Sequence, residues 1–361
     1  MLDKVVELVK KYPKISDFHL RSECAFSYRL LGEIQSIQEN TVKKEQIEQI
    51  LNKYCSKDDV DHFNTKNELD SGFTVENIRF RANFYKTLHG PALVLRKVET
   101  TILSMESLNL PPAMFSIVDM HKGLVLVTGP TGSGKSTTLA AIINQINETR
   151  KANIITIEDP VEFIHKDKKS IISQREVGKQ TESFTTALKS ALREDPDVIL
   201  VGEMRDLETT HIAIETAETG HLVFGTLHTT TAASTVDRII DQFPADRQSQ
   251  IRTMLGSSLK GVIAQTLCKK VPKGRIAALE IMICTNAISN LIREGKTFQI
   301  DSAMQVGGKD GMVLLNKALL KHVQDGLIEP QEALNRSINR RDMMEQLKST
   351  EIDTSTLVAE D

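Results

Sequence analysis

A phosphate-binding loop is the strongest chemical signal in the sequence. Residues 129–136 read Gly-Pro-Thr-Gly-Ser-Gly-Lys-Ser, which matches the pattern G-x-x-x-x-G-K-[ST]. Glycines let such a loop curl until backbone N–H groups point at phosphate oxygens, and a following helix adds the positive end of its dipole. We expect Lys135 to reach the β- and γ-phosphates of ATP and the Ser136 hydroxyl to ligate Mg²⁺. The predicted nucleotide contacts are Gly129, Pro130, Thr131, Gly132, Ser133, Gly134, Lys135, Ser136 and Thr137.

An acid is expected at the end of a neighbouring strand. The apolar run 198–201 lies between Asp197 and Glu203. At the rise of a β-strand these two residues are roughly 20 Å apart, so they cannot share one Mg²⁺. Ligands bind beyond the carboxyl ends of parallel strands. Glu203 is therefore predicted to be the functional acid, close to the metal, and Asp197 to be structural.

Two further apolar runs are followed by acidic or histidine side chains. The run 154–157 leads into Glu158 and Glu162, one of which is expected to position or deprotonate the attacking water. The sequence leaves both glutamates open for this role. His221 and His228 flank the run 222–227 at opposite ends, too far apart for one metal site. His228, at the carboxyl end, is predicted to sense the γ-phosphate.

Residues 1–100 have the pattern of a small α+β domain. The predicted elements are a helix at 42–54 and strands at 71–76, 78–86 and 91–98. In the second of these strands, apolar residues alternate with Arg79, Arg81 and other polar residues, which places the arginines on the exposed face. Phosphoryl transfer often uses an additional cation supplied by another subunit. Arg81 and Arg96 could provide it.

The rest of the chain predicts a second domain. Residues 101–115 end in Pro111-Pro112 and are interpreted as a linker. Short apolar runs separated by helical patterns then indicate a mostly parallel sheet covered by helices, in a domain spanning 116–345. The pattern becomes helical after about residue 280. The polar and acidic segment 346–361 is expected to form a disordered tail. The predicted fold class is α/β.

Composition excludes several classes of protein. The net charge of −3 over 361 residues argues against a dedicated duplex-DNA binder. The four cysteines contain no C-x-x-C pair, which excludes a zinc ribbon and disfavours a disulfide framework. We find no signal-peptide pattern and no run of apolar residues long enough to cross a membrane, so we expect a cytoplasmic protein.

These motifs, in this order, resemble the type II/IV secretion ATPase superfamily, most closely the PilT/PilU retraction ATPases of type IV pili. Besides the P-loop and the acidic and histidine segments, the resemblance includes Ser-Asp-Phe-His-Leu at 16–20, Arg-Phe-Arg-Ala-Asn at 79–83, Glu-Met-Arg-Asp at 203–206 and Ala-Ile-Ser-Asn-Leu-Ile-Arg-Glu at 287–294. The resemblance implies a PAS-like N-terminal domain, a RecA-like P-loop ATPase domain, ATP bound between the two domains, and a homohexameric ring.

The resemblance also implies roles for residues and partners. Glu162 would be the catalytic base, Glu203 the Walker B glutamate, and Arg81 and Arg96 the paired arginines that stabilise the transition state. ATP hydrolysis would power pilus retraction and twitching motility. The implied partner is an inner-membrane platform protein of the PilC kind, met at the cytoplasmic face of the membrane. No nucleic acid is expected.

Departures from the pattern leave an alternative open. Ser289 stands where the retraction signature has arginine, although the apolar stripe around it still predicts an amphipathic core helix. Residues 129–136 and 201–208 resemble PilT, whereas residues 95–102, 243–247 and the tail resemble PilU. The alternative is an accessory PilU-like ATPase that depends on a paralogous partner motor.

Two other classes of ATPase are disfavoured. A RecA-type nucleic-acid motor is disfavoured by the near-neutral charge. The missing four-cysteine motif disfavours an assembly ATPase.

Overall fold

A computed structural model divides the chain into two units, Met1–Thr101 and Ile102–Asp361. It describes residues 1–361 except 31, 99–100, 351, 353, 355–356 and 358–361. Half of the predicted acidic tail, at 351, 353, 355–356 and 358–361, lies outside the described residues. The described part differs from the prediction at one point, because helix α14 (Arg340–Ser349) includes the first residues assigned to the tail.

The first unit is built on a six-stranded antiparallel sheet in the order β3-β2-β1-β6-β5-β4. Three of its strands were predicted, with small changes of boundary. Strands β1 to β3 were not, because β3 is exposed along most of its length and bulges interrupt the ladders of β1 and β2. The elements are α1 (Leu2–Lys11), β1 (Ile15–Arg21), β2 (Cys24–Leu30), β3 (Glu33–Val42), α2 (Lys44–Tyr54), α3 (Lys57–Lys66), β4 (Glu68–Val75), β5 (Ile78–Thr87) and β6 (Gly90–Lys97).

The two faces of this sheet have opposite character. Phe18 on β1 is fully buried, and its ring lies 6.1 Å from that of Phe26 and 6.3 Å from that of Phe80. The buried sides of α1, α2 and α3 join the same apolar cluster. Because side chains alternate along a strand, Asp17 is on the opposite face, where it meets Arg96. One face therefore carries the core and the other carries charge.

The second unit is built on a seven-stranded sheet in the order β13-β12-β7-β11-β10-β8-β9. The pairs from β12 to β9 are parallel, and β13 is antiparallel to β12. The strands are β7 (Gly123–Thr128), β8 (Asn153–Glu158), β9 (Ile171–Glu176), β10 (Val198–Val201), β11 (Leu222–Leu227), β12 (Leu259–Lys269) and β13 (Arg275–Ile283). The predicted α/β class and mostly parallel sheet are confirmed.

Helices cover both faces of this sheet, because alternate strand residues feed two cores. Val125 and Val127 pack with α4 and α5, whereas Leu124 and Leu126 pack with helices α6 to α10. The helices are α4 (Pro112–Val118), α5 (Lys135–Thr149), α6 (Phe184–Ala191), α7 (Leu207–Glu218), α8 (Ala232–Asp241), α9 (Ala245–Ser258) and α10 (Asn286–Arg293).

Nearly all of the predicted linker at 101–115 belongs to the second unit, which begins at Ile102. Met105 and Leu110 are buried in the core under α4 and α5. Their apolar side chains make this segment part of the second unit, and Pro112 already begins α4. The proline pair that suggested a linker therefore marks a helix start, where proline is tolerated.

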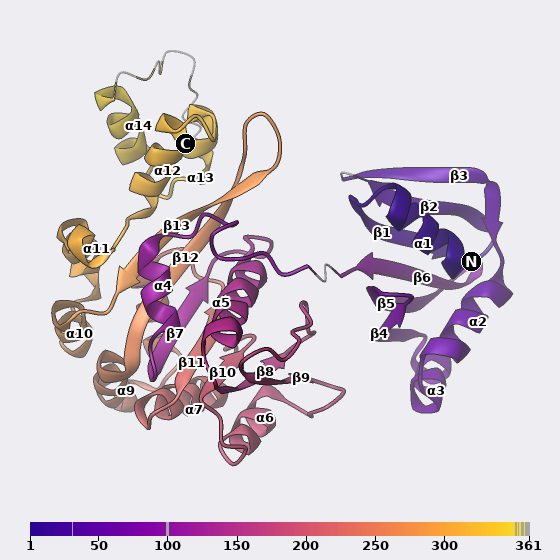
Figure 1. The fold of residues 1–361 in the computed structure, drawn as a ribbon, viewed down its shortest axis with the longest axis horizontal. Helices are drawn as coiled ribbons and strands as arrows, with labels where there is room; N and C mark the ends of the chain where they lie inside the picture. The colour runs from indigo at the N-terminus through magenta and orange to yellow at the C-terminus, as the bar shows by residue number, and fades with distance from the viewer. Residues whose placement is uncertain (31, 99–100, 351, 353, 355–356, 358–361) are drawn as a thin grey trace. The chain divides into compact units, whose positions relative to one another are not determined.

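Helices follow β13 as far as Ser349, in agreement with the helical pattern predicted after about residue 280. They are α11 (Ile300–Val306), α12 (Leu315–Gln324), α13 (Pro330–Arg336) and α14, with two short 3-10 turns, η1 (Thr297–Gln299) and η2 (Gly307–Asp310). We call α12, α13 and α14 the C-terminal helix group. It packs around the far end of the β12–β13 hairpin (Figure 1). Among the described helices, none has the length and apolar character needed to cross a bilayer.

Ser289 lies inside this framework rather than on its surface. It is 8% exposed on α10, and its hydroxyl lies 3.5 Å from the sulfur of Cys284. Ile288 and Ile292 of the same helix are fully buried, so the predicted amphipathic core helix is present. A Cβ added at Gly256 of α9 would lie 3.0 Å from the Ser289 carbonyl oxygen, which shows how closely the two helices approach.

The aromatic cluster around Phe18 predicts how strongly the stability of the first unit depends on this side chain. We expect Phe18→Ala to lower the free energy of unfolding by about 3–5 kcal/mol, because it removes a large buried ring and leaves a cavity. Phe18→Leu, which fills most of the space, should cost about 1 kcal/mol. Chemical denaturation of both variants measures the difference. Equal losses in the two variants would show that the cavity is not the cause.

Candidate nucleotide-binding site

The P-loop connects the end of β7 to the start of α5, as its sequence requires. Gly129 has φ +140° and Gly134 has φ +91°, a region that favours glycine. Packing adds a second reason at Gly129, since a Cβ there would lie 2.2 Å from the backbone oxygen of Gln265 on β12. The loop is thus held directly against the neighbouring strand β12. The residues 129–137 that are predicted to contact the nucleotide form this loop and the first turn of α5.

Lys135 folds over this loop and faces two acids. Its Nζ donates to the carbonyl oxygen of Gly129 at 2.7 Å and to that of Pro130 at 3.2 Å. Burial lowers the pKa of Lys135, while the negative charges of Glu203 and Glu162 oppose that shift. Both predicted carboxylates are therefore close enough to the lysine to act on its charge.

Glu203 and His228 meet at the edge of the sheet. The His228 Nε2 lies 3.0 Å from one Glu203 oxygen, and the Arg205 Nη2 lies 2.7 Å from the other. Burial disfavours the charge of Glu203, but hydrogen bonds and charge from Arg205 and His228 outweigh it and lower its pKa. The carboxylate is therefore ionised and oriented. This pairing follows from the adjacent parallel strands β10 and β11.

The residues at the opposite ends of these strands have structural partners. Asp197 accepts a hydrogen bond from the backbone N–H of Asn153 at 2.8 Å, at the amino end of β10. The Nδ1 of His221 lies 3.1 Å from the carbonyl oxygen of Thr216 in α7. Neither lies at the carboxyl edge that carries the P-loop.

The two candidate bases differ in environment. Burial raises the pKa of Glu158, although its carboxylate accepts hydrogen bonds from Thr156 Oγ1 at 2.7 Å and Gln174 Nε2 at 3.3 Å. The backbone of Glu162 also hydrogen-bonds this carboxylate. Glu162 itself is exposed and acts on the charge of Lys135. Glu158 is thus occupied by protein donors, whereas the side chain of Glu162 is accessible to solvent.

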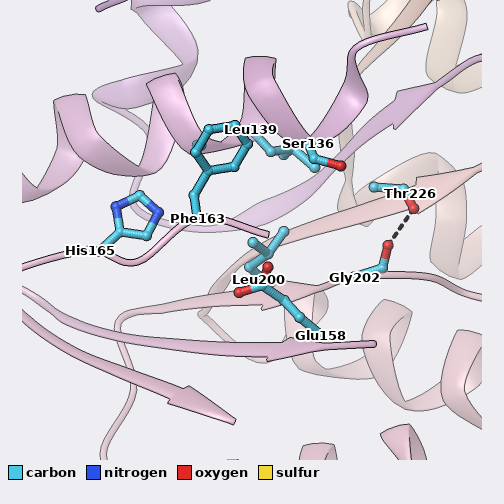
Figure 2. A pocket seen from close by; sticks show the side chains of 9 residues that line it. Ser136, Leu139, Glu158, Phe163, His165, Leu200, Gly202 and Thr226 are labelled. Atoms are coloured by element: carbon cyan, nitrogen blue, oxygen red, sulfur yellow. Dashed lines mark hydrogen bonds between the residues drawn. The ribbon is translucent and has the colours of Figure 1, made fainter. Parts of the chain in front are cut away.

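A pocket lies beside the P-loop, between α5 and the segment after β8. Figure 2 shows Ser136 and Leu139 on one side, Phe163 and His165 on another, and Glu158 below them. Gly202 and Thr226, which are joined by a hydrogen bond, complete the lining together with Ala140 and Leu200. Ser136 and Glu158 therefore line one shared space.

Gln174 on β9 positions the segment after β8, and the sequence did not single it out. Its Oε1 accepts the backbone N–H of His165 at 2.8 Å, and its Nε2 donates to the carbonyl oxygen of Phe163 at 2.9 Å. The same Nε2 reaches Glu158. A side-chain amide can donate and accept at once, which suits this role. No sequence signal could have found it, because β9 was not predicted.

Gln265 on β12 performs the corresponding task for the P-loop and was also missed. Its side chain is 3% exposed. Its Nε2 donates to the carbonyl oxygen of Ser133 at 2.6 Å, and its Oε1 accepts from the Thr138 hydroxyl at 2.8 Å. Both polar atoms of the amide are thus used to join the loop to the first turns of α5.

Arg81 and Arg96 are neighbours in the first unit. They are directly opposite each other on β5 and β6, and both side chains are substantially exposed. The Arg96 Nε lies 2.8 Å from Asp17 Oδ1, and the Arg81 Nη2 lies 4.0 Å from Asp70. The predicted pair thus lies side by side on the face of the sheet that carries charge, and each arginine has an aspartate beside it.

The chemistry of the donors fits Mg²⁺ bound together with phosphate. Ser136 and Glu203 offer a hydroxyl and a carboxylate oxygen, both hard ligands. Among the described residues, no group of three or more His, Cys, Asp or Glu side chains could hold a metal by itself. Proteins usually hold Mg²⁺ with one or two carboxylates together with nucleotide phosphates.

Comparison with known proteins agrees with this geometry. The family described as type II/IV secretion system protein matches residues 23–336. The chain belongs to this family. The resemblance predicted from the motifs is confirmed.

Relatives of this family member carry names connected with type IV pili. A twitching motility protein of Neisseria gonorrhoeae is 55% identical over 76% of this chain and 74% of its own length. The retraction ATPase PilT of Pseudomonas aeruginosa is 47% identical over 89% and 94%. The ATPase PilU of the same organism is 35% identical over 92% and 88%. A crystal structure of the pilus retraction motor PilT with bound ADP superposes with a TM-score of 0.88 at 42% identity, covering 94% of this chain and 99% of that one.

The contacts of Gln265 predict a specific loss of nucleotide affinity. In Gln265→Ala the carbonyl of Ser133 and the hydroxyl of Thr138 lose their buried partner, so we expect ADP to bind about tenfold more weakly, or about 1.4 kcal/mol. Titration with a fluorescent ADP analogue measures this. Ile263→Val, on the same strand, should cost about 1 kcal/mol of stability without changing affinity. Unchanged affinity in Gln265→Ala would contradict the role.

His165 predicts a pH dependence of stability. Its Nδ1 has no hydrogen-bond partner among the described residues, and burial with the nearby charge of Lys168 lowers its pKa to about 4 from 6.5. Between these values the unfolded chain binds a proton that the folded chain excludes, so stability falls as pH falls. We expect that His165→Gln avoids up to about 3 kcal/mol of this loss in the free energy of unfolding between pH 6.5 and about 4. Chemical denaturation at several pH values in this range measures it. An unchanged slope would refute this.

Proposed function

We propose that this chain is an ATPase that powers retraction of type IV pili. The observation that carries the proposal is the P-loop between β7 and α5, whose Lys135 is within electrostatic reach of Glu203 and Glu162, because a phosphate-binding cation and nearby carboxylates are what ATP hydrolysis requires. The 47% identity to PilT over most of both chains supports retraction as the purpose. The 35% identity to PilU is lower, so the accessory reading is the less favoured candidate.

Different residues of the second unit bind the phosphates, hold Mg²⁺ and activate the attacking water. Backbone N–H groups of the P-loop and the Lys135 ammonium bind the phosphates. Glu203 and Ser136 would hold Mg²⁺, which when bound neutralises developing phosphate charge. His228, fixed by its contact with Glu203, is placed to respond to the γ-phosphate. Glu162 orients and deprotonates the attacking water, since its carboxylate is accessible while that of Glu158 is already hydrogen-bonded.

Arg81 and Arg96 complete the proposal. Their guanidinium groups would stabilise charge on the transferred phosphoryl group, as an arginine supplied by another subunit often does. A homohexameric ring would provide such a neighbour. At the cytoplasmic face of the inner membrane, a platform protein of the PilC kind would receive the motion, and no nucleic acid takes part. Ring assembly, the platform partner and the membrane site are all parts of the proposal.

The test is Mg-ATP turnover by the purified full chain in its oligomeric fraction. We expect Glu162→Gln to lower kcat by about 100-fold or more, because a general base is removed, with little change in KM. Glu158→Gln is the matched variant and should retain more activity. Lys135→Ala should abolish turnover.

Three outcomes would change the proposal. Full turnover in Lys135→Ala would refute the nucleotide assignment. Activity retained in Glu162→Gln but lost in Glu158→Gln would transfer the base to Glu158. Tight ATP binding with negligible turnover in the wild type, restored by a partner ATPase, would favour the accessory reading.

A further inference from the structure

A buried carboxylate on β13 joins two helices. Glu280 is 4% exposed. Its Oε1 accepts the backbone N–H of Ala232 at 2.8 Å, and its Oε2 accepts that of Leu315 at 3.2 Å. Ala232 is the first residue of α8 and Leu315 is the first residue of α12. Each oxygen of one side chain is therefore used by the start of a different helix.

A carboxylate suits this position physically. The first N–H groups of a helix lack partners within the helix, and the helix dipole favours negative charge at that end. Helix α12 has no side-chain N-cap of its own among the described residues. Burial, and to a lesser degree the charge of Asp301, raises the pKa of Glu280, while the N–H groups of Ala232 and Leu315 oppose this shift. The buried hydrogen-bond partners of the Glu280 carboxylate are thus backbone N–H groups at the starts of two helices.

The α8 end of this link is close to the nucleotide site. Thr231, which caps α8, follows His228 by three positions in the chain. The hydroxyl of Thr235, in the first turns of α8, lies 2.7 Å from that of Thr229 and 3.5 Å from that of Thr128. Thr128 is the last residue of β7 before the P-loop. The start of α8 is therefore tied both to the histidine segment and to the P-loop strand.

The α12 end belongs to the C-terminal helix group. Leu315 and Leu319 of α12 share a buried cluster with Leu334 of α13 and with Met343 and Leu347 of α14. Close-packed side chains transmit displacement rather than absorb it. A shift at the start of α12 would thus be felt by the whole group.

We propose that Glu280 is a positioning residue that couples nucleotide occupancy at the P-loop to the C-terminal helix group, by holding the starts of α8 and α12 to one carboxylate. The proposal rests on the proposed function, since it requires that the chain bind nucleotide. When the segment from His228 to Thr231 responds to nucleotide, the displacement of α8 reaches α12 through Glu280.

Hydrogen–deuterium exchange of the full chain, with and without Mg-ADP, tests this. In the wild type we expect Mg-ADP to change the exchange of amides in α12. In Glu280→Gln, one of the two acceptors becomes an N–H₂ group facing a donor, so the Mg-ADP-dependent change in α12 should fall about threefold or more, with ADP affinity within about threefold of wild type. Asn339→Ala removes the cap of α14 in the same helix group and should leave the response intact.

A second pair of variants isolates the hydrogen bond without touching Glu280. Leu315→Pro and Leu315→Ala both lose the leucine side chain, but only proline also loses the N–H that Glu280 accepts. Proline is tolerated at the first position of a helix, and Leu314 has the extended backbone that a following proline requires. We expect the α12 response to be lost in Leu315→Pro and kept in Leu315→Ala.

The results separate failure of the coupling from failure of the proposed function. A full α12 response in Glu280→Gln, or equal responses in Leu315→Pro and Leu315→Ala, would overturn the coupling. So would a wild-type protein that binds Mg-ADP without any change in α12. A wild type that does not bind Mg-ADP would refute the proposed function itself.

Discussion

The parallel register of β7, β11, β10 and β8 is the constraint on which the candidate site depends. Thr128 is paired with Leu227, and Val201 is level with Gly225 and Ile157. The carboxyl ends of four strands therefore reach the same edge of the sheet. Because a different loop leaves each strand there, the P-loop, His228, Glu203 and the segment of Glu158 and Glu162 are brought together although they are distant in sequence. This is the edge at which α/β sheets bind ligands.

Register alone does not fix the loops, and two glutamines supply what it lacks. Gln265 holds the P-loop from β12, and Gln174 holds the segment after β8 from β9. In both cases a neutral amide donates to one backbone or side-chain group and accepts from another. A charged side chain would have cost more to bury and could not have satisfied both kinds of partner. The site is thus preorganised by residues that take no part in its chemistry.

The β12–β13 hairpin connects this site to the rest of the second unit. Gln265 points from β12 toward α5, while Glu280, on β13 opposite the adjacent residue Ala264, points to α8 and α12. Strand alternation places these two polar side chains on opposite faces of the sheet. The hairpin thereby contacts the P-loop on one face and the starts of two helices on the other. The same strands bear the C-terminal helix group at their far end.

The sequence by itself determined the P-loop, the α/β class, the buried parallel strands and the acids and histidine at their carboxyl ends. It could do so because each depends on a local pattern, either a motif of fixed spacing or a short apolar run. It did not distinguish Glu158 from Glu162, and it missed β1 to β3, β9, Gln174, Gln265 and Glu280. The strands and the buried contacts that it missed were decided by tertiary structure, because they depend on which strands become neighbours and which polar atoms are buried together. A glutamine or glutamate acquires such a role only through partners that are far away in the chain.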